Sequence, residues 1–321
     1  MSPSPKTLVI ATRGSRLALA QTEIVSALLR ARHPELDIEV MVVSTTGDRD
    51  KRPFAEIGGK GLFTGEVEAA IVAREADIAV HSAKDLTAEL APGCAIVCIP
   101  ARASVHDVVV GGSGASGEER LASLPPGARV GTSSLRRRAL LMEWRPDLEA
   151  VEFRGNVDTR LRKVADGEVD AAILAAAGIE RLGVEADVAA IDPGRWLPAP
   201  SQGAIAIEAR VDRADLEALL APFEDPASRA QVEAERAFAR VMEGGCSVPL
   251  GCYSRVAEGR LVVDGFLGLP DGTHSMRDRI SGGLHEGAAL GAELAEAIIS
   301  SGGREILDDL AEFERPPVPE P

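Results

Sequence analysis

Two stretches of the chain share one construction, and this repetition limits the folds that the sequence can adopt. Near the N-terminus, the short apolar run 8–11 leads into Arg13 and Ser15, and a segment with helical spacing follows. The stretch 130–144 has the same order: a short apolar run, hydroxyl and Arg residues, then an amphipathic segment. A strand that leads through polar residues into a helix is the repeating unit of α/β proteins. Each stretch therefore predicts a buried strand, a polar turn and a helix.

A second similarity points to two related halves of the chain. The segments 76–80 and 169–173 are alike, and each has the composition of a buried strand. We expect an α/β fold with two similar, doubly wound lobes of the solute-binding-protein type that face each other across a cleft. A small C-terminal α/β domain with a three-stranded sheet follows. The expected domain limits are 1–102 with 203–221, 105–198, and 222–321, so a strand at 204–209 returns to the first domain.

Periodicity and turn residues predict the remaining elements. Ser15 is the expected N-cap of a helix over 16–32. Further strands are expected at 38–44, 95–99, 108–110, 150–153, 253–256, 261–267 and 276–281, and further helices at 64–75, 227–242 and 288–300. The polar stretch 45–60 is interpreted as a flexible lid, because long loops in compact domains are commonly functional or mobile. The stretch 111–117 is interpreted as a glycine-serine turn.

The chain is acidic overall, yet it gathers arginine locally. Its 321 residues carry a formal net charge of −15, which argues against a surface for nucleic acid or anionic membranes. The three consecutive residues Arg136, Arg137 and Arg138 fan out around a helix, so two can face one site while the third faces water. Guanidinium groups match carboxylates and phosphates bidentately, so we expect such a ligand in a cleft. A general preference for Arg would explain the number of these residues but not their clustering.

The sequence also bears on location and metal binding. The first residues lack the apolar core of a signal sequence, and no run approaches transmembrane length, so we expect a cytoplasmic protein. Its four cysteines, Cys94, Cys98, Cys246 and Cys252, are then expected to be reduced. Their spacing does not fit a zinc site, and no metal is expected. Taken alone, each of these residues would be interpreted as an inert thiol.

Six motifs occur in a fixed order along the chain, at 13–15, 81–85, 131–137, 154–160, 198–203 and 244–249. In this order they resemble the porphobilinogen deaminase, or hydroxymethylbilane synthase, family over nearly the whole chain. The resemblance implies an enzyme that links four porphobilinogen molecules head to tail into the linear tetrapyrrole hydroxymethylbilane, releasing ammonia at each addition. It also implies a dipyrromethane cofactor attached to Cys246 by a thioether. We expect a monomer that binds neither nucleic acid nor membranes.

The resemblance assigns roles to single side chains. Asp85 matches the family's catalytic aspartate, since a carboxylate can accept the pyrrole N–H bonds and stabilise the positive charge of the azafulvenium left by deamination. The implied cofactor-binding residues are Cys246, Lys84, Asp85, Thr132, Ser133, Ser134, Arg136 and Arg137. The implied substrate-binding residues are Arg13, Ser15, Lys60, Phe63, Arg154, Arg160, Arg181 and Gln202. The chemistry agrees independently, because each pyrrole carries an acetate and a propionate that guanidinium groups can bind.

Other interpretations are open for some of these residues. Lys84 and Asp85 alone would suggest a surface ion pair, Phe63 fits the core equally well, and His81 is expected in the core or in a supporting position. The sequence departs from the family pattern at Ala83 (usually Met), Leu86-Thr87 (often Val-Pro), Asp158 (commonly Asn) and Ser201 (commonly Gly). These departures affect fine geometry, because none removes a charged group used above.

Two other functions compete with the enzymatic interpretation. A non-enzymatic, two-lobed anion-binding protein of the solute-binding type would explain the lobes and the arginines. It would not explain Cys246 in its glycine-flanked loop, or the third domain. A phosphoryl-transfer enzyme would need a phosphate loop and metal-binding carboxylates, which the sequence does not show.

Overall fold

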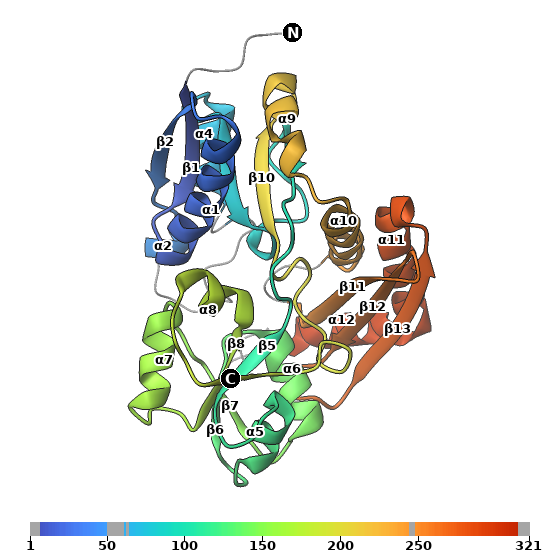
Figure 1. The fold of residues 1–321 in the computed structure, drawn as a ribbon. Helices are drawn as coiled ribbons and strands as arrows, with labels where there is room; N and C mark the ends of the chain where they lie inside the picture. Colours follow the sequence, from blue (N-terminus) through green and yellow to red (C-terminus); the bar gives the residue numbers. More distant parts are fainter. Residues whose placement is uncertain (1–6, 50–60, 62–63, 244–247, 314–321) are drawn as a thin grey trace, which may run out of the picture.

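Three β-sheets, each with its own helices, make up the fold (Figure 1). The structure, a computed structural model, describes residues 7–49, 61, 64–243 and 248–313. Lobe 1 surrounds the five-stranded sheet at the top of Figure 1, lobe 2 surrounds the five-stranded sheet below it, and domain 3 surrounds the three-stranded sheet at the side. The strands of each sheet lie within one of the three expected domain ranges, while the domain limits themselves stay a prediction.

Lobe 1 has the strand order β2-β1-β3-β10-β4. β1 pairs in parallel with β2 and β3, whereas β10 pairs antiparallel with β3 and β4, so the strand near 204–209 does return to this lobe. Helices α1 and α9 cover one face of the sheet, and α4 covers the other. The elements are β1 Thr7–Arg13, α1 Arg16–Arg32, β2 Asp37–Val43, α2 Thr46–Arg49, α4 Gly65–Val72, β3 Ile78–Ser82, η1 Ala83–Asp85, β4 Cys94–Cys98, β10 Ile205–Arg210, α9 Ala214–Leu220 and η2 Ala221–Phe223.

Lobe 2 repeats this arrangement in the order β7-β6-β8-β5-β9. β6 pairs in parallel with β7 and β8, and β5 pairs antiparallel with β8 and β9. β6 therefore corresponds to β1, and β8 to β3, which confirms the two related halves expected from the sequence. Helices α5 and α6 pack on one face, and α7 and α8 on the other. The elements are β5 Asp107–Gly111, α5 Gly117–Ser123, β6 Arg129–Gly131, α6 Leu135–Trp144, β7 Glu149–Val151, α7 Val157–Ala165, β8 Ala171–Ala175, α8 Ala176–Leu182 and β9 Val188–Ala190.

Domain 3 packs helices against an antiparallel sheet with the order β11-β12-β13. Its core centres on Phe238, which is fully buried. The elements are α10 Pro226–Val241, β11 Leu250–Ala257, β12 Arg260–Gly268, β13 Ser275–Gly282, η3 Leu284–Glu286, α11 Gly287–Ile298, the π-helical turn η4 Ile299–Gly303 and α12 Arg304–Phe313. Among the residues that the structure describes, no helix combines the length and the apolar character needed to cross a membrane.

Side-chain caps explain where several helices begin. The Ser15 hydroxyl accepts a hydrogen bond from the Ala18 N–H at 3.2 Å, which confirms Ser15 as the N-cap of α1. Ser134 caps α6 in the same way. The two strand–turn–helix units recognised in the sequence are therefore built alike.

The structure also contains elements that the sequence interpretation missed. α5 follows the expected glycine-serine turn, and its capping box of Ser116 and Glu119 was a readable signal for a helix start. No helix was expected at α9 or α12. The interpretation of 45–60 as loop is wrong at its beginning, where Thr46–Arg49 forms the short helix α2. Residues 50–60 lie outside the described residues.

Two segments connect lobe 1 to lobe 2, and they run side by side (Figure 1). The Ala103 N–H donates to the Gly203 carbonyl oxygen at 3.1 Å. Gly203 has a φ of +85°, and a Cβ there would lie 2.6 Å from the carbonyl oxygens of Ala103 and Ser104. Only glycine therefore fits where the two crossing segments meet.

Domain 3 anchors both crossing segments through Glu235 of α10, which is completely buried. Its carboxylate forms a bidentate pair with Arg102 on the first segment, at 2.9 and 2.8 Å. It also accepts the Ser201 N–H of the second segment at 2.6 Å and the Ser254 N–H of β11 at 2.8 Å. One carboxylate thus joins the connection between the lobes to domain 3.

Ser201, which stands where the family pattern commonly has glycine, is strained. Its φ is +64°, and its buried hydroxyl has no hydrogen-bond partner among the described residues. We expect Ser201→Gly to raise the free energy of unfolding by about 1 kcal/mol, since the left-handed backbone and the unsatisfied hydroxyl both cost stability. Urea unfolding measures this change. Glu258→Gly, at an exposed turn residue with a φ of +51°, is the control for the backbone contribution alone; a loss of stability in Ser201→Gly would contradict the argument.

Candidate active site

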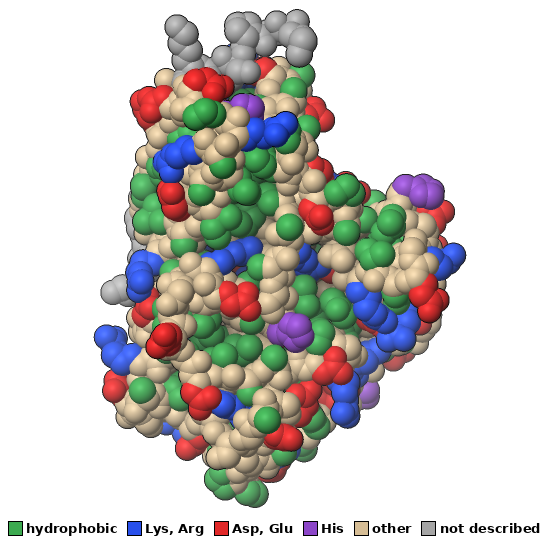
Figure 2. All heavy atoms as spheres, viewed as in Figure 1, with side chains coloured by type: hydrophobic (Ala, Val, Ile, Leu, Met, Phe, Trp, Pro, Cys, Tyr) green, Lys and Arg blue, Asp and Glu red, His purple; other side chains and the backbone are tan. Residues whose placement is uncertain are grey.

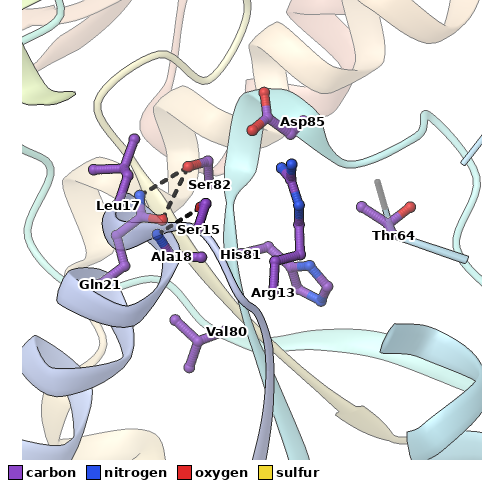
Figure 3. Close-up of a pocket in the computed structure, with 10 residues that line it drawn as sticks. All are labelled: Arg13, Ser15, Leu17, Ala18, Gln21, Thr64, Val80, His81, Ser82 and Asp85. Atoms are coloured by element: carbon purple, nitrogen blue, oxygen red, sulfur yellow. Dashed lines mark hydrogen bonds between the residues drawn. The ribbon is translucent and has the colours of Figure 1, made fainter. Parts of the chain in front are cut away.

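A pocket lies at the carboxyl ends of β1 and β3 in lobe 1 (Figure 3). It is lined by Arg13, Ser15, Leu17, Ala18, Gln21, Thr64, Val80, His81, Ser82 and Asp85. This end of a sheet is the usual ligand position in α/β proteins. Figure 3 shows the Arg13 side chain extending from β1 toward Asp85. The structure thus brings together three residues that the sequence proposed for one site, Arg13, Ser15 and Asp85.

The end of β3 determines where Asp85 lies. β3 runs directly into the single turn η1, which carries Lys84 and Asp85. Two hydrogen bonds between the side chains of Ser82 and Gln21, at 2.8 and 3.0 Å, fix this end of β3 to α1. The Asp85 side chain is exposed in the pocket. Asp85 is therefore placed by fixed backbone and remains accessible to a ligand.

The hydroxyl residues before α6 organise the facing edge of lobe 2. The Ser133 hydroxyl donates to the Phe153 carbonyl oxygen at 2.8 Å, which joins β6 to the segment after β7. The Thr132 hydroxyl accepts the Ser134 N–H at 3.2 Å, and Ser134 caps the helix. All three side chains thus bond to backbone and shape the start of α6.

The guanidinium groups of Arg136 and Arg137 meet at Asp107, the first residue of β5. The carboxylate of Asp107, which has no exposed side-chain surface, accepts from Arg136 at 2.8 Å and from Arg137 at 2.7 Å. Gln202 and Trp196 each donate a further hydrogen bond, both at 2.9 Å. The two cations hold the pKa of Asp107 far below its ordinary value, against the opposing effect of burial. Arg138 is exposed, as expected for one of the three arginines.

Asp107 is a site residue that the sequence analysis did not identify. It opens a strand of small apolar residues, and a single Asp at a strand start gives no signal of burial. Two arginines share this one carboxylate, so the group keeps a net positive charge. In the described structure the Nε atoms of both Arg136 and Arg137 are buried without a hydrogen-bond partner. Arg136 also donates to the Leu197 carbonyl oxygen at 2.7 Å and Arg137 to that of Ile173 at 2.9 Å, so the pair retains for an anion its net charge and the two Nε–H groups.

Lys84 links lobe 1 to this group. Although the residue as a whole is exposed, protein surrounds its amine, which lies 3.5 Å from the side-chain oxygen of Gln202, whose amide nitrogen donates to Asp107. The surrounding protein desolvates the amine and lowers its pKa to about 8; Asp85 acts in the opposite direction, and Arg137 adds to the lowering. A neighbouring anion would therefore stabilise the charged form of this amine.

Further arginines of lobe 2 surround the same opening. Burial, with the charges of Arg137 and Arg154, lowers the pKa of Arg160 to about 10, although Glu152 opposes this. In the described part of the chain, the buried Nε of Arg160 has no hydrogen-bond partner. Arg181 donates to the Gly203 carbonyl oxygen at 2.7 Å, on the crossing segment. Arg154 pairs with Glu152 at 3.0 Å. Figure 2 shows Lys and Arg side chains where the two lobes meet.

Three residues implied by the resemblance, Lys60, Phe63 and Cys246, lie outside the described residues. Both flanks of the segment 244–247 are described. On one side, Arg236 and Arg240 of α10 donate to the Ala88 carbonyl oxygen, three residues after Asp85. On the other side, the Cys252 N–H donates to the Pro198 carbonyl oxygen at 3.0 Å. The segment with Cys246 is therefore flanked by residues that contact the surroundings of Asp85 and of the crossing segment.

The other cysteines are poor nucleophiles. Burial raises the pKa of Cys94 to about 11 and that of Cys98 to about 12. Burial also raises the pKa of Cys252 well above its ordinary value. The thiolate is the reactive form, so these three side chains suit packing and not covalent attachment.

Comparisons with known proteins agree with this arrangement. The family profile "Porphobilinogen deaminase, dipyromethane cofactor binding domain" matches residues 8–218, and "Porphobilinogen deaminase, C-terminal domain" matches residues 230–300. A porphobilinogen deaminase of Syntrophobacter fumaroxidans is 44% identical over 303 residues, which cover 94% of this chain and 97% of that protein. One of Roseiflexus castenholzii is 45% identical over 302 residues, covering 94% and 98%.

Solved structures resemble the chain only loosely. The periplasmic aliphatic sulphonate binding protein SsuA of Escherichia coli has a TM-score of 0.42 and 14% identity, over 99% of this chain and 94% of that one. The sequence relationships identify the family of this chain. The two profiles together span both lobes and most of domain 3, and the relatives match almost end to end. The chain belongs to the porphobilinogen deaminase family.

Proposed function

We propose that the chain joins four porphobilinogen molecules into hydroxymethylbilane, with release of ammonia, on a dipyrromethane cofactor attached to Cys246. Membership of the family supports the reaction. The observation that carries the assignment of the site is that Lys84, the neighbour of the accessible carboxylate Asp85, lies close to the Arg136 and Arg137 cations of lobe 2, while Arg13 lines the Asp85 pocket from lobe 1. A cytoplasmic location and a monomeric state are part of this proposal.

The residues present fit a cofactor that carries several carboxylates. Lys84, Arg136, Arg137 and Arg160 come from two lobes, and three of their guanidinium Nε atoms are buried without a partner in the described structure. Lys84 and Arg160 both have lowered pKa values, so each is stabilised by an incoming anion. Lys84, Arg136 and Arg137 would hold the cofactor's acetate and propionate groups beside α6. Arg13, Arg154, Arg160 and Arg181, with Ser15 and Gln202, would hold the incoming porphobilinogen and the growing chain.

Asp85 would perform the central step. When bound, the cofactor supplies the nucleophilic α-carbon of its terminal pyrrole. The Asp85 carboxylate accepts pyrrole N–H bonds and stabilises the positive charge that develops on the deaminated substrate. The same carboxylate can receive the proton lost from the α-carbon after the new bond has formed. The arginines neutralise the substrate carboxylates and orient the rings, which makes the reaction effectively unimolecular.

Intact-mass measurement of the denatured protein tests this function against the alternative, a non-enzymatic anion-binding protein. We expect the mass of the chain plus two pyrrole units in the wild type and the bare mass in Cys246→Ser. Cys252→Ser is the matched control and should keep the added mass, because its thiol is buried with a raised pKa. Incubation with porphobilinogen before the measurement loads any empty protein. A bare wild-type mass after that incubation would favour the anion-binding protein.

Arg160→Gln should weaken the addition of substrate. One charge-assisted hydrogen bond contributes about 1.5–3 kcal/mol, so we expect the KM for porphobilinogen to rise by about 10- to 100-fold. Arg162→Gln, an exposed residue on the same helix α7, is the control and should leave the KM unchanged. Equal kinetics for both variants would contradict a substrate-binding role for Arg160.

A further inference from the structure

A cluster of buried polar groups lies behind the Asp85 pocket, and the proposed mechanism does not use it. Thr64 directly precedes α4, and Glu68 lies in the first turn of that helix. His81 comes from β3 and Glu208 from β10. Their exposed fractions are 1%, 7%, 5% and 0%. The His81 Nε2 atom lies 3.1 Å from a carboxylate oxygen of Glu208, but the two are not aligned for a hydrogen bond.

Most of the polar atoms in this cluster lack a partner. Within the described residues, the Thr64 hydroxyl, one Glu68 oxygen, the His81 Nε2 atom and both Glu208 oxygens have no N–H or O–H partner, although the Cys94 thiol interacts with Glu208. Buried polar groups are nearly always satisfied, and exceptions call for an explanation such as a catalytic role or a bound water. Apart from the hydroxyl and the imidazole, these atoms are carboxylate oxygens, which accept hydrogen bonds. The cluster therefore contains more hydrogen-bond acceptors than aligned donors, and one added proton would supply a further donor.

The charges around the cluster agree with this excess of hydrogen-bond acceptors over donors. Burial, and next the charge of Glu208, raises the pKa of Glu68 above its ordinary value. Two carboxyl groups thus lie beside one imidazole. The charged and titratable groups that face His81 from the surrounding elements are Arg13 of β1, Glu68 of α4, Asp85 of η1, Cys94 of β4, Glu208 of β10 and Arg236 of α10. Among the described residues, no three His, Cys, Asp or Glu side chains could together hold a metal ion.

His81 connects the cluster to the pocket. Its ring lines the same pocket as Asp85, and Figure 3 shows it beside the backbone end of the Arg13 side chain, which extends toward Asp85. On its other side the ring contacts Glu208, a carboxylate that water does not reach. A carboxylate at this distance from an imidazole stabilises the imidazolium form by its charge.

We propose that His81, supported by Glu208, is a second proton-accepting group of the Asp85 pocket, which restores the Asp85 carboxylate between condensations. This rests on the proposed function. In each cycle the α-carbon C–H bond breaks, its electron pair restores the aromatic ring, and the proton passes to Asp85. A water in the pocket then carries the proton to the His81 imidazole. The ammonia has already left before the new C–C bond forms, so the imidazolium passes this proton to solvent water, and each cycle ends with both groups as they began.

The test uses cofactor-loaded enzyme, verified by intact mass, with His81→Gln and Glu208→Gln. The rate of successive pyrrole additions is followed by rapid quench across pH, in H₂O and in D₂O. We expect His81→Gln to slow the additions after the first by 10-fold or more, to remove one step from the pH–rate profile, and to raise the solvent isotope effect. Glu208→Gln should also slow the later additions and alter the pH–rate profile in the same way, but by a smaller amount. The KM for porphobilinogen should stay within about 2-fold, because neither side chain binds the substrate carboxylates.

His33→Gln is the matched control, since the partly buried His33 lies 3.8 Å from a carboxylate, that of Glu35, but does not line the Asp85 pocket, and it should leave rates and profile unchanged. A merely structural role for His81 would lower the melting temperature while leaving the shape of the pH–rate profile intact, and that result would overturn the proposal. If His81→Gln does not fold, Glu208→Gln decides alone. Asp85→Asn is measured in parallel: wild-type rates there would overturn the role of Asp85 itself, whereas a slow Asp85→Asn beside a normal His81→Gln would overturn only this inference.

Discussion

Asp85→Asn is expected to lower the rate of pyrrole addition by about 10²–10⁴-fold while leaving the fold intact. The amide keeps the shape of the side chain but loses the negative charge that stabilises the developing cation and accepts the proton. The side chain is exposed, and within the part of the chain that the structure describes no backbone hydrogen bond depends on it, so unfolding in urea should be unchanged. Single-turnover mixing of cofactor-loaded enzyme with porphobilinogen measures the rate directly.

Glu89→Gln is the matched control for Asp85→Asn, because Glu89 is an exposed carboxylate in the segment that follows η1 and does not line the pocket. It should add pyrroles at the wild-type rate. A near-normal rate in Asp85→Asn would remove Asp85 from the mechanism. A rate loss in both variants would instead point to the charge of the whole segment.

The same substitution should change how binding depends on pH. Burial lowers the pKa of Lys84 to about 8, and Asp85 is the largest of the influences that oppose this lowering. Without this carboxylate the pKa of Lys84 falls further, and the amine loses its charge at a lower pH. As the pH rises from 7, the affinity of Asp85→Asn for carboxylates should therefore fall at a lower pH than that of the wild type. Titration with porphobilinogen at a series of pH values measures this affinity.

The sequence predicted elements that local signals specify. β1 and α1 were predictable because an apolar run, a hydroxyl cap and a helical period follow one another, and β6 and α6 repeat that order. The similarity of 76–80 and 169–173 predicted two related halves, and in the structure β3 and β8 hold equivalent positions in their sheets. The candidate site was harder to predict. Its residues come from distant parts of the chain, and only the order of the family's motifs linked them.

Residues whose role depends on three-dimensional surroundings could not be predicted in this way. The sequence suggested that two of Arg136, Arg137 and Arg138 face one site, but not that a carboxylate lies between them. Asp107 is 29 residues before Arg136 and has no motif of its own. Likewise, His81 was assigned to a core or supporting position, and the unsatisfied groups around it become visible only once α4 and β10 are packed against β3.

Asp107→Ala should cause the largest loss of stability. The substitution leaves two guanidinium groups, only 4% and 8% exposed in their side chains, without their shared carboxylate. Removing one partner of a buried ion pair costs about 3–5 kcal/mol. Trp196 and Gln202 lose an acceptor at the same time.

The stability that Asp107 contributes depends on pH, because its folded-state pKa is far below the ordinary value. This contribution to the free energy of unfolding is complete above the ordinary carboxyl pKa of about 4, and it is lost only as the pH falls through the lower folded value. The stability difference should therefore be constant from about pH 5 to pH 8.

Urea unfolding of three variants separates the causes of this loss. Asp187→Ala in the same lobe is the control, because Asp187 also pairs with a buried Arg side chain but is itself 88% exposed, so its loss should cost at most about 1 kcal/mol. The triple variant Asp107→Leu, Arg136→Met, Arg137→Met should recover much of the stability lost in Asp107→Ala, since apolar groups can replace a buried ion pair. It should still fail to load the cofactor, because the two cations that would hold its carboxylates are gone. Equal stability of Asp107→Ala and Asp187→Ala would mean that the two arginines find other partners, and that Asp107 does not hold this side of the cleft together.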